Sequence, residues 1–318
     1  MNLLFYKRNL KRYVLQTIPK NKETFLDALK YKLKFILRLA ALTFEFYFLK
    51  RIYIPYIEVA ITTRCSLKCK YCANYINTVE EKYQHSLTSD EFKTYLDNLL
   101  CNVSKLDFLK IFGGEPLLNK DLDKILQIAL DNKKISVVWL TTSGTIDISD
   151  NLISIMKRYP GKIYVNISNY TLNKDLAPRL KTQAILYKCK QNGILTKLDE
   201  SGALWNKTSE IKYHSRSPQA NRNYFLKCKI HCIHILNGKL YPCPKAAIFD
   251  LRNIYNTMLP DEFSDMQIIK DKEYIDLSAP VEKEQLIKFY SNADYLACNF
   301  CSQVEDEKKE KVIPAIQE

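Results

Sequence analysis

Three cysteines within eight residues are the most reactive feature of this sequence: Cys65, Cys69 and Cys72. Their spacing, with three and then two intervening residues, allows three thiolates to turn toward one point. Cysteine-rich loops bind zinc or iron–sulfur clusters, but a complete structural site takes four ligands. No fourth ligand is near, because His85 lies thirteen residues further on and Cys101 falls in a predicted helix. A [4Fe–4S] cluster on three thiolates would keep one iron open for a small ligand, which suits catalysis.

The chain after residue 54 alternates short apolar runs with helical periodicity, which predicts about five βα units. Strands are expected at 57–63, 106–112, 135–141, 163–168 and 194–198, and helices at 120–132, 150–159 and 176–191, with another helix starting at a capping box in 88–91. Strands that are apolar on both faces and separated by helices indicate a parallel sheet. Functional groups gather at the carboxyl ends of such strands, which is where the cysteines fall.

The motif CxxxCxYC directly after the first strand resembles the signature of the radical S-adenosylmethionine (radical SAM) superfamily. The resemblance implies an α/β fold in which residues 55–204 form a partial (β/α)6-type parallel barrel. It also implies a [4Fe–4S] cluster on Cys65, Cys69 and Cys72, with S-adenosylmethionine (SAM) bound at the open iron. Tyr71 is similar to the family residue whose backbone meets the adenine of SAM.

Other stretches resemble the family's SAM-binding motifs at the ends of later strands. Gly113-Gly114-Glu115-Pro116 closes the second strand, where the family binds the methionine amino group, with Glu115 as an acceptor. Only glycine lets backbone approach a ligand this closely; the alternative is a tight strand-to-helix turn. Ser143 and Ser168 follow the third and fourth strands, where relatives bind the methionyl portion and the ribose. Either serine could instead be a helix cap or a turn residue.

A second cysteine pattern lies after residue 204. It reads CX9GX4C and, much later, CNFC, which resembles the SPASM and "twitch" extensions that hold auxiliary iron–sulfur clusters. Five cysteines follow residue 200, so the shorter twitch form, with one four-cysteine cluster, fits better than the full SPASM form. The resemblance implies the ligands Cys228, Cys243, Cys298 and Cys301, while Cys232 could replace Cys228. A four-cysteine zinc site would look almost the same in sequence.

The resemblance implies that the reduced cluster passes one electron to SAM. SAM then splits to a 5′-deoxyadenosyl radical, which takes hydrogen from a substrate carbon. An auxiliary cluster suggests that the substrate is oxidised, so we expect an oxidoreductase-type enzyme with flavodoxin or ferredoxin as electron donor. We expect a small or carbohydrate-like substrate, because no peptide-leader-binding domain is recognisable. Peptide or protein modification of the SPASM type is the alternative. No secretory signal is visible, so a cytoplasmic location is expected.

Positive charge is concentrated in residues 1–54, which hold 12 Lys and Arg against 3 Asp and Glu, a net charge of +9 within a chain total of +13. The apolar stretch 35–49 is interrupted by Arg38 and Glu45, whereas a spanning helix needs ~20 largely uncharged residues. The segment is either a helix packed on the main domain or a basic amphipathic helix that lies on an anionic membrane or binds a polyanionic partner. Nucleic acid is not expected as a partner, because no binding motif accompanies the basic residues.

The length of 318 residues and the hydrophobic content of 47% exclude a disordered chain and allow one large or two small domains. We expect a basic helical segment at 1–54, the radical SAM core at 55–204, a small loop-rich cysteine-containing domain at 205–304 and a charged tail at 305–318. Residues 305–311 of that tail should fray. The rival to an enzyme is a non-catalytic metal-binding module that docks on membrane or nucleic acid through residues 1–54.

Overall fold

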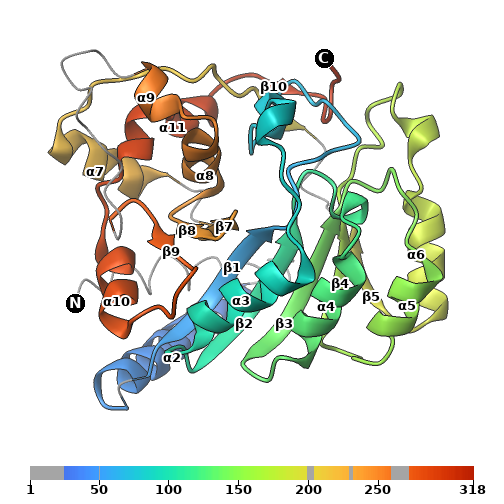
Figure 1. Cartoon of the computed structure of the whole chain (residues 1–318), viewed down its shortest axis with the longest axis horizontal. Helices are drawn as coiled ribbons and strands as arrows, with labels where there is room; N and C mark the ends of the chain where they lie inside the picture. Colours follow the sequence, from blue (N-terminus) through green and yellow to red (C-terminus); the bar gives the residue numbers. More distant parts are fainter. Residues whose placement is uncertain (1–24, 50, 199–203, 229–231, 259–271) are drawn as a thin grey trace.

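The computed structural model describes residues 25–49, 51–198, 204–228, 232–258 and 272–318. Its largest element is an eight-stranded sheet with the strand order β5-β4-β3-β2-β1-β7-β8-β9 (Figure 1). Residues 1–24 of the predicted N-terminal segment lie outside the described residues.

The first five strands of the sheet are parallel, as the sequence predicts, and β7 pairs with the other side of β1, also in parallel. The next two strands, β8 and β9, are antiparallel. The strands are β1 Tyr53–Ala60, β2 Lys105–Phe112, β3 Ile135–Thr142, β4 Ile163–Ile167, β5 Leu195–Leu198, β7 His234–Leu236, β8 Lys239–Tyr241 and β9 Ile275–Asp276. A separate antiparallel pair consists of β6 Trp205–Asn206 and β10 Lys311–Val312.

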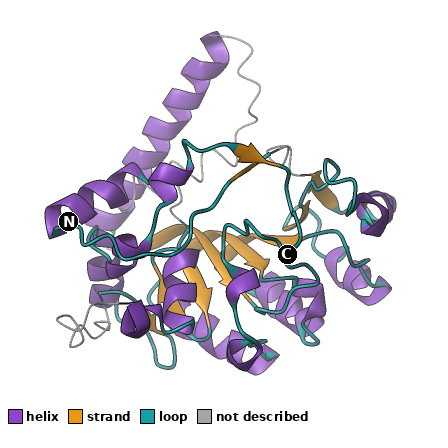
Figure 2. Cartoon of the chain, turned by 90° about the horizontal axis from the view of Figure 1, so that it is seen from above, coloured by secondary structure: helices purple, strands orange, loops and turns teal. Residues whose placement is uncertain are grey.

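Helices follow most of the parallel strands and cover the sheet (Figures 1 and 2). In the first half of the chain these are α3 Ser89–Leu100, α4 Leu122–Asp131, α5 Asp150–Met156 and α6 Thr182–Gln191. In the second half they are α7 Pro218–Lys227, α8 Pro244–Leu251, α9 Ile254–Met258, α10 Lys283–Ser291 and α11 Gln303–Asp306. The predicted capping box at the start of α3 is confirmed, with the Thr88 hydroxyl and the Glu91 carboxylate each bonding the other's backbone amide.

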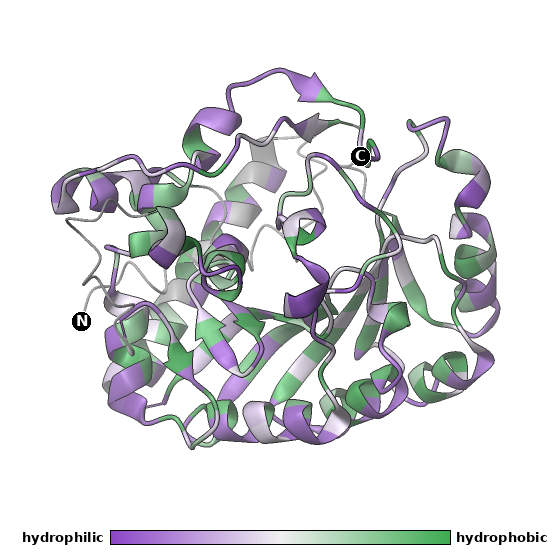
Figure 3. Ribbon diagram, turned by 45° about the horizontal axis from the view of Figure 1, so that its top comes forward, coloured by the Kyte–Doolittle hydropathy of each residue, from purple (hydrophilic) through white to green (hydrophobic). Residues whose placement is uncertain are grey.

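The core lies between the sheet and these helices. Every residue of β1 is buried, because this strand has neighbours on both sides and covered faces. The inner stripe of α4 belongs to the same core, and its side chains are each at most 2% exposed: Leu122, Ile125, Leu126 and Ala129. Hydrophobic residues accordingly follow the strands and the helix sides that face them (Figure 3).

The predicted helix 176–191 begins six residues late, at Thr182. The intervening chain forms a single 3-10 turn, Ala177–Arg179. Pro178 explains the difference, since a proline lacks the N–H that a helix interior needs and disfavours helical geometry in the residue before it. The mixed α/β fold is confirmed, but the described strands form an open sheet that ends at β5 and β9 and do not close into a barrel.

The last part of the chain is more ordered than the sequence suggested. The segment expected to fray, 305–311, includes the last two residues of α11 and the first residue of β10. Asp306 is fully buried and accepts hydrogen bonds from the backbone amide (3.1 Å) and the hydroxyl of Ser209. Charge density alone therefore gave the wrong prediction here, because one of the acids is paired inside the fold.

The N-terminal helix α2, Phe25–Tyr47, runs out from the body of the molecule (Figure 2). It contacts the sheet through Leu42, which is fully buried, and through Arg38, which hydrogen-bonds to the Asp107 carboxylate at 3.2 Å. Within the described residues, no helix has the length and hydropathy needed to cross a membrane.

Candidate active site

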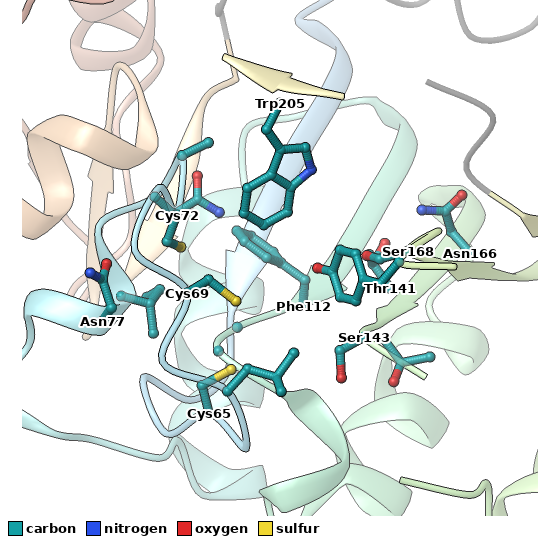
Figure 4. A pocket seen from close by; sticks show the side chains of 18 of the residues that line it. Cys65, Cys69, Cys72, Asn77, Phe112, Thr141, Ser143, Asn166, Ser168 and Trp205 are labelled. Carbon is teal, nitrogen blue, oxygen red and sulfur yellow. The ribbon is translucent and has the colours of Figure 1, made fainter. Parts of the chain in front are cut away.

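The cysteine loop lies at the carboxyl edge of the sheet, directly after β1. A cavity of about 300 Å³ opens beside the loop, and Cys65, Cys69 and Cys72 form one of its walls (Figure 4). The ends of β3 and β4 contribute Ser143 and Ser168 to the opposite wall. The structure thus brings the three cysteines, called here the three-cysteine site, to the same cavity as the two predicted SAM-binding serines.

Gly113 and Gly114 place the end of β2 against the start of the cysteine loop. The Gly114 amide donates a hydrogen bond to the Thr62 carbonyl oxygen at 2.8 Å. A Cβ atom would lie 2.3 Å from that oxygen on Gly113, and 2.2 Å from the Arg64 carbonyl oxygen on Gly114. Both glycines also line the cavity. We expected them to permit close approach to a ligand; the close approach seen here is to the backbone that carries the cysteines.

The three thiols are poorly hydrated. Burial raises the pKa of Cys65 to about 11 and that of Cys69 to about 12, and the pKa of Cys72 is raised for the same reason. Because metals bind the thiolate, a bound cationic group would compensate for the lost hydration. No three His, Cys, Asp or Glu side chains in the described ranges are placed to hold a single metal ion. A cluster binds each cysteine through a different iron, so three thiols around one cavity fit a cluster.

Glu115 is fully buried but does not line the cavity. Its carboxylate accepts hydrogen bonds from the Thr142 hydroxyl and the Ser143 amide, both at 2.8 Å, and from the Ser143 hydroxyl. Burial raises the pKa of Glu115 despite these bonds. Pro116 starts a 3-10 turn, Pro116–Leu118, and also lies outside the cavity wall. In this arrangement Glu115 ties the end of β2 to the end of β3, and its role as a SAM acceptor stays a prediction.

Trp205 of β6 lies over the cavity (Figure 4). Its ring meets the Tyr170 ring edge-on, with the ring centres 5.7 Å apart. Trp205 also lines a neighbouring cavity of about 340 Å³, and the predicted SAM-binding Tyr71 belongs to that one. The prediction for Tyr71 concerned its backbone, so the position of its side chain does not test it.

Sequence reasoning missed a charged pair inside the sheet. Glu58 of β1 and Lys110 of β2 are register partners, and the Lys110 amine lies 3.3 Å from the Glu58 carboxylate. Glu58 is 2% exposed and also accepts a hydrogen bond from the Tyr56 hydroxyl at 2.6 Å. Lys110 lines the cavity together with Asn166. Charged residues inside two otherwise apolar strands were the available signal, because buried charges are rare unless paired.

The chain segment 314–318 holds the cysteine loop from the other side. The Lys70 amide donates to the Ile316 carbonyl oxygen at 2.8 Å, and the Glu318 amide donates to the Lys68 carbonyl oxygen at 2.9 Å. The Gln317 side chain accepts from the Lys68 amide at 2.9 Å and donates to the Cys69 sulfur at 3.6 Å. No motif in the sequence pointed to this contact, because it joins residues 248 positions apart.

The second cysteine pattern also converges in space. The predicted ligands line one small cavity of about 30 Å³ and are called here the four-cysteine site: Cys228, Cys243, Cys298 and Cys301. They come from three segments: the end of α7, the N-cap of α8, and the 3-10 helix Leu296–Phe300 with the residue after it. Burial raises the pKa of Cys243 to about 12 and raises that of Cys298 well above its ordinary value. Cys232 does not line this cavity and packs with Tyr56 and Phe108 instead.

Lys245 lies in the wall of the four-cysteine site. It is 4% exposed, and the described residues give its amine no hydrogen-bond acceptor. The amine lies 5.0 Å from the centre of the Tyr75 ring. Burial acts to lower the pKa of Lys245, but the Cys301 thiol, the Tyr75 hydroxyl and the Asp306 carboxylate together outweigh it, so the pKa is raised. A buried cation without a hydrogen-bond acceptor is costly, and an anionic group in the four-cysteine site would stabilise it further.

Comparison with known proteins supports the sequence motif. Residues 59–193 match the model of the family described as the radical SAM superfamily. The GTP 3′,8-cyclase of Aliarcobacter butzleri is 31% identical over 141 residues, which are 42% of this chain and 40% of that protein. Molybdenum cofactor biosynthesis protein 1 of Dictyostelium discoideum is 31% identical over 120 residues, 38% of this chain and 18% of that protein. The chain thus spans two fifths or less of the length of these relatives.

Two solved structures are loosely similar. Streptococcus suis SuiB bound to S-adenosylmethionine is 16% identical, with a TM-score of 0.39 over 74% of this chain and 53% of that one. BtrN in complex with AdoMet and 2-DOIA is 17% identical, with a TM-score of 0.41 over 67% of this chain and 85% of that one.

The cysteine loop and the strands β2, β3 and β4 lie within the residues that match the radical SAM model. This family implies a [4Fe–4S] cluster and S-adenosylmethionine as cofactors.

Proposed function

We propose that this protein is a radical SAM enzyme that cleaves SAM to a 5′-deoxyadenosyl radical and removes hydrogen from a small substrate. The observation that carries the proposal is the single cavity at the carboxyl ends of the strands, with three cysteines on one wall and polar side chains on the other. The bound cofactors supply the electron transfer and the radical chemistry, and the chain supplies binding, orientation and exclusion of water.

The two walls of the cavity are proposed to bind different cofactors. Cys65, Cys69 and Cys72 hold the cluster, and the backbone at Gly113 and Gly114 keeps the cysteine loop against the sheet. Ser143 and Ser168 remain the proposed contacts to SAM on the opposite wall. The Ser143 hydroxyl already donates to Glu115, and its oxygen lies 2.9 Å from the Thr145 hydroxyl and accepts from the Thr145 amide at 3.4 Å. A contact between Ser143 and SAM would therefore replace one of these bonds.

Aromatic side chains limit the access of water. Trp205 and Tyr170 contact each other at the cavity wall, and Trp205 comes from the two-stranded β6–β10 pair. A carbon radical must be kept from solvent and side reactions, so we propose that this pair of strands covers the substrate.

The substrate is proposed to meet Lys110, Thr141 and Asn166. All three line the cavity, and the Thr141 hydroxyl is buried without a hydrogen-bond partner among the described residues. The amine of Lys110, the hydroxyl of Thr141 and the amide of Asn166 can all form hydrogen bonds to oxygen atoms. They therefore suit a small molecule rich in oxygen, such as a carbohydrate-like compound. A volume of about 300 Å³ lies at the lower end of the range typical of small-molecule sites, ~300–1,000 Å³. Relatives named for a reaction on GTP make a sugar-bearing nucleotide one member of this class.

The four-cysteine site is proposed to hold an auxiliary iron–sulfur cluster that takes an electron from the substrate. Its walls are almost entirely apolar apart from the sulfurs and Lys245. A site of this kind offers no room for a substrate beside the metal, and the buried lysine suits a permanently anionic group better than an empty cavity. The external electron donor is proposed to be of the flavodoxin or ferredoxin type.

Anaerobic reconstitution with iron and sulfide tests the function. The wild-type chain should yield 5′-deoxyadenosine when SAM and a reductant are added, and Cys65→Ala should reduce the yield to background. Cys101→Ala is the matched control, because Cys101 is exposed at the end of α3 and lines neither site. If Cys65→Ala made as much 5′-deoxyadenosine as the wild type, the assignment would be wrong.

A further inference from the structure

The helix α2 presents a row of apolar side chains to solvent. Leu29, Leu33, Ile36, Leu37 and Phe44 are between 52% and 60% exposed. Their spacing places them along one stripe of a helix, because residues three, four, seven and eight positions apart share a face. Monomeric proteins rarely expose so many large apolar groups together, so this stripe calls for a partner.

The stripe is not the surface by which α2 packs on the protein. Leu42, which is fully buried, lies on the opposite side of the helix at 100° per residue. Arg38 is on that inner side too, where its guanidinium covers the Tyr53 ring at 4.6 Å and bonds Asp107. The sheet therefore contacts the side of the helix that lies opposite the stripe.

Lysines border the outer stripe. At 100° per residue, Lys30 and Lys34 fall on one side of it and Lys32 on the other, and all three are exposed. The described residues give none of these amines a carboxylate partner. Phe48, just after the helix, is 73% exposed and stacks on Phe44 with ring centres 5.0 Å apart, so it lengthens the apolar row.

We propose that α2 binds an anionic lipid membrane, lying flat with the stripe Leu29, Leu33, Ile36, Leu37, Phe44 in the boundary between headgroups and acyl chains. An apolar row edged by lysines is the pattern of helices that bind membrane surfaces. Charge favours lipid over a second copy of the chain, because residues 1–54 carry a net +9 and two copies would bring like charges together.

Co-sedimentation of the full chain with vesicles tests this proposal. We expect binding to vesicles of phosphatidylcholine mixed equally with phosphatidylglycerol, and little binding to phosphatidylcholine alone. Leu33→Glu combined with Phe44→Glu should weaken the partition about tenfold or more, since two apolar groups are lost from the interface. Lys30→Gln combined with Lys34→Gln keeps the apolar row and should weaken only the part of binding that high salt removes.

The matched control is Leu172→Glu combined with Tyr187→Glu. These apolar residues are 48% and 67% exposed and lie outside α2, so their replacement should leave the partition unchanged. Circular dichroism and the unfolding midpoint show whether each variant is folded. Equal partition of the α2 variant and the control would overturn the proposal. A second result would also overturn it: the wild type is a dimer that does not bind anionic vesicles, and Leu33→Glu combined with Phe44→Glu converts it to monomers. A second copy of the chain would then occupy the stripe.

Discussion

The three-cysteine site and the four-cysteine site differ in how the chain builds them. The first takes its thiols from one loop of eight residues, and its cavity of about 300 Å³ is shared with hydroxyl, amide and lysine side chains. The second collects thiols from three segments around a cavity of about 30 Å³ whose wall is almost wholly apolar. The first has space for a molecule beside a bound cluster, whereas the second is small and almost dry and has no space for a substrate.

This difference fits the proposed roles, in which the first site binds the reacting molecules and the second only exchanges electrons. A reacting group needs neighbouring space and polar contacts, while a group that only exchanges electrons needs a fixed, dry surrounding whose charge sets its potential. Glycines and hydrogen bonds to distant backbone position the first site. The second site is buried, and a lysine without a hydrogen-bond acceptor among the described residues lines it. Each of the following four variants acts on one of these features.

Gly114→Ala should have the largest effect, because its Cβ would lie 2.2 Å from the Arg64 carbonyl oxygen and the cysteine loop would have to move. We expect formation of 5′-deoxyadenosine to fall at least about hundredfold, the loss typical of reacting groups displaced by an ångström. Gly161→Ala is the control, since no atom lies within 4 Å of its Cβ and only its φ of +75° costs stability. Similar losses in both variants would mean that crowding at the cysteine loop is not the cause.

Glu273→Gln should change how stability depends on pH near the four-cysteine site. The Glu273 carboxylate accepts from the Leu296 amide at 2.9 Å, and burial raises its pKa from 4.5 to about 7. The folded state therefore binds the proton more tightly, so this group lowers the free energy of unfolding as pH rises from about 4.5 to 7. We expect the glutamine variant to lack this decline, worth about 2 kcal/mol, in urea unfolding at pH 5 and 8. Glu284→Gln, at an exposed site, should keep it.

Lys245→Met should act on the four-cysteine site alone. Removing a buried cation beside an anionic cluster disfavours its reduction, and we expect the reduction equilibrium to fall about tenfold, ~1.4 kcal/mol. A redox titration followed by electron paramagnetic resonance would measure both clusters. Lys227→Met is the control, because Lys227 adjoins Cys228 but is exposed to water. An unchanged potential in Lys245→Met would remove the proposed role of the lysine.

Gln317→Ala should have the smallest effect and should act on the three-cysteine site. It removes the donor to the Cys69 sulfur and the acceptor for the Lys68 amide. Hydrogen bonds to cluster sulfurs favour the reduced form, so the potential should fall by the equivalent of ~1 kcal/mol or less. The same titration measures it, with Gln219→Ala as control, whose side chain bonds only Asn223 among the described residues. A shift at the four-cysteine site instead would contradict the local role of Gln317.

The sequence was sufficient for the features that depend on local pattern. The period of the apolar residues predicted five parallel strands, and the spacing of Thr88 and Glu91 predicted the start of α3. The spacing of Cys65, Cys69 and Cys72 predicted that these three thiols share a cavity, and the resemblance to auxiliary-cluster extensions predicted the other four. Strands, caps and the three-cysteine loop could be predicted because they are set by residues close together in the chain.

The remaining features depend on contacts between distant residues. Glu58 and Lys110 pair only because β1 and β2 are in register, and Gln317 reaches Cys69 only in the folded chain. The addition of β7 to the far side of β1 likewise leaves no trace in local periodicity. The predicted domain boundaries and the roles of individual site residues stay predictions.

The bond between Gln317 and Cys69 also orders events in time. A ribosome adding ~5–20 residues per second needs roughly 12–50 s to make the 248 residues between them. During that interval the cysteine loop has emerged but lacks its backbone partner in 314–318. We therefore expect a nascent chain stalled before residue 314 to leave the loop open to proteases, and stable iron loading to follow the synthesis of that segment.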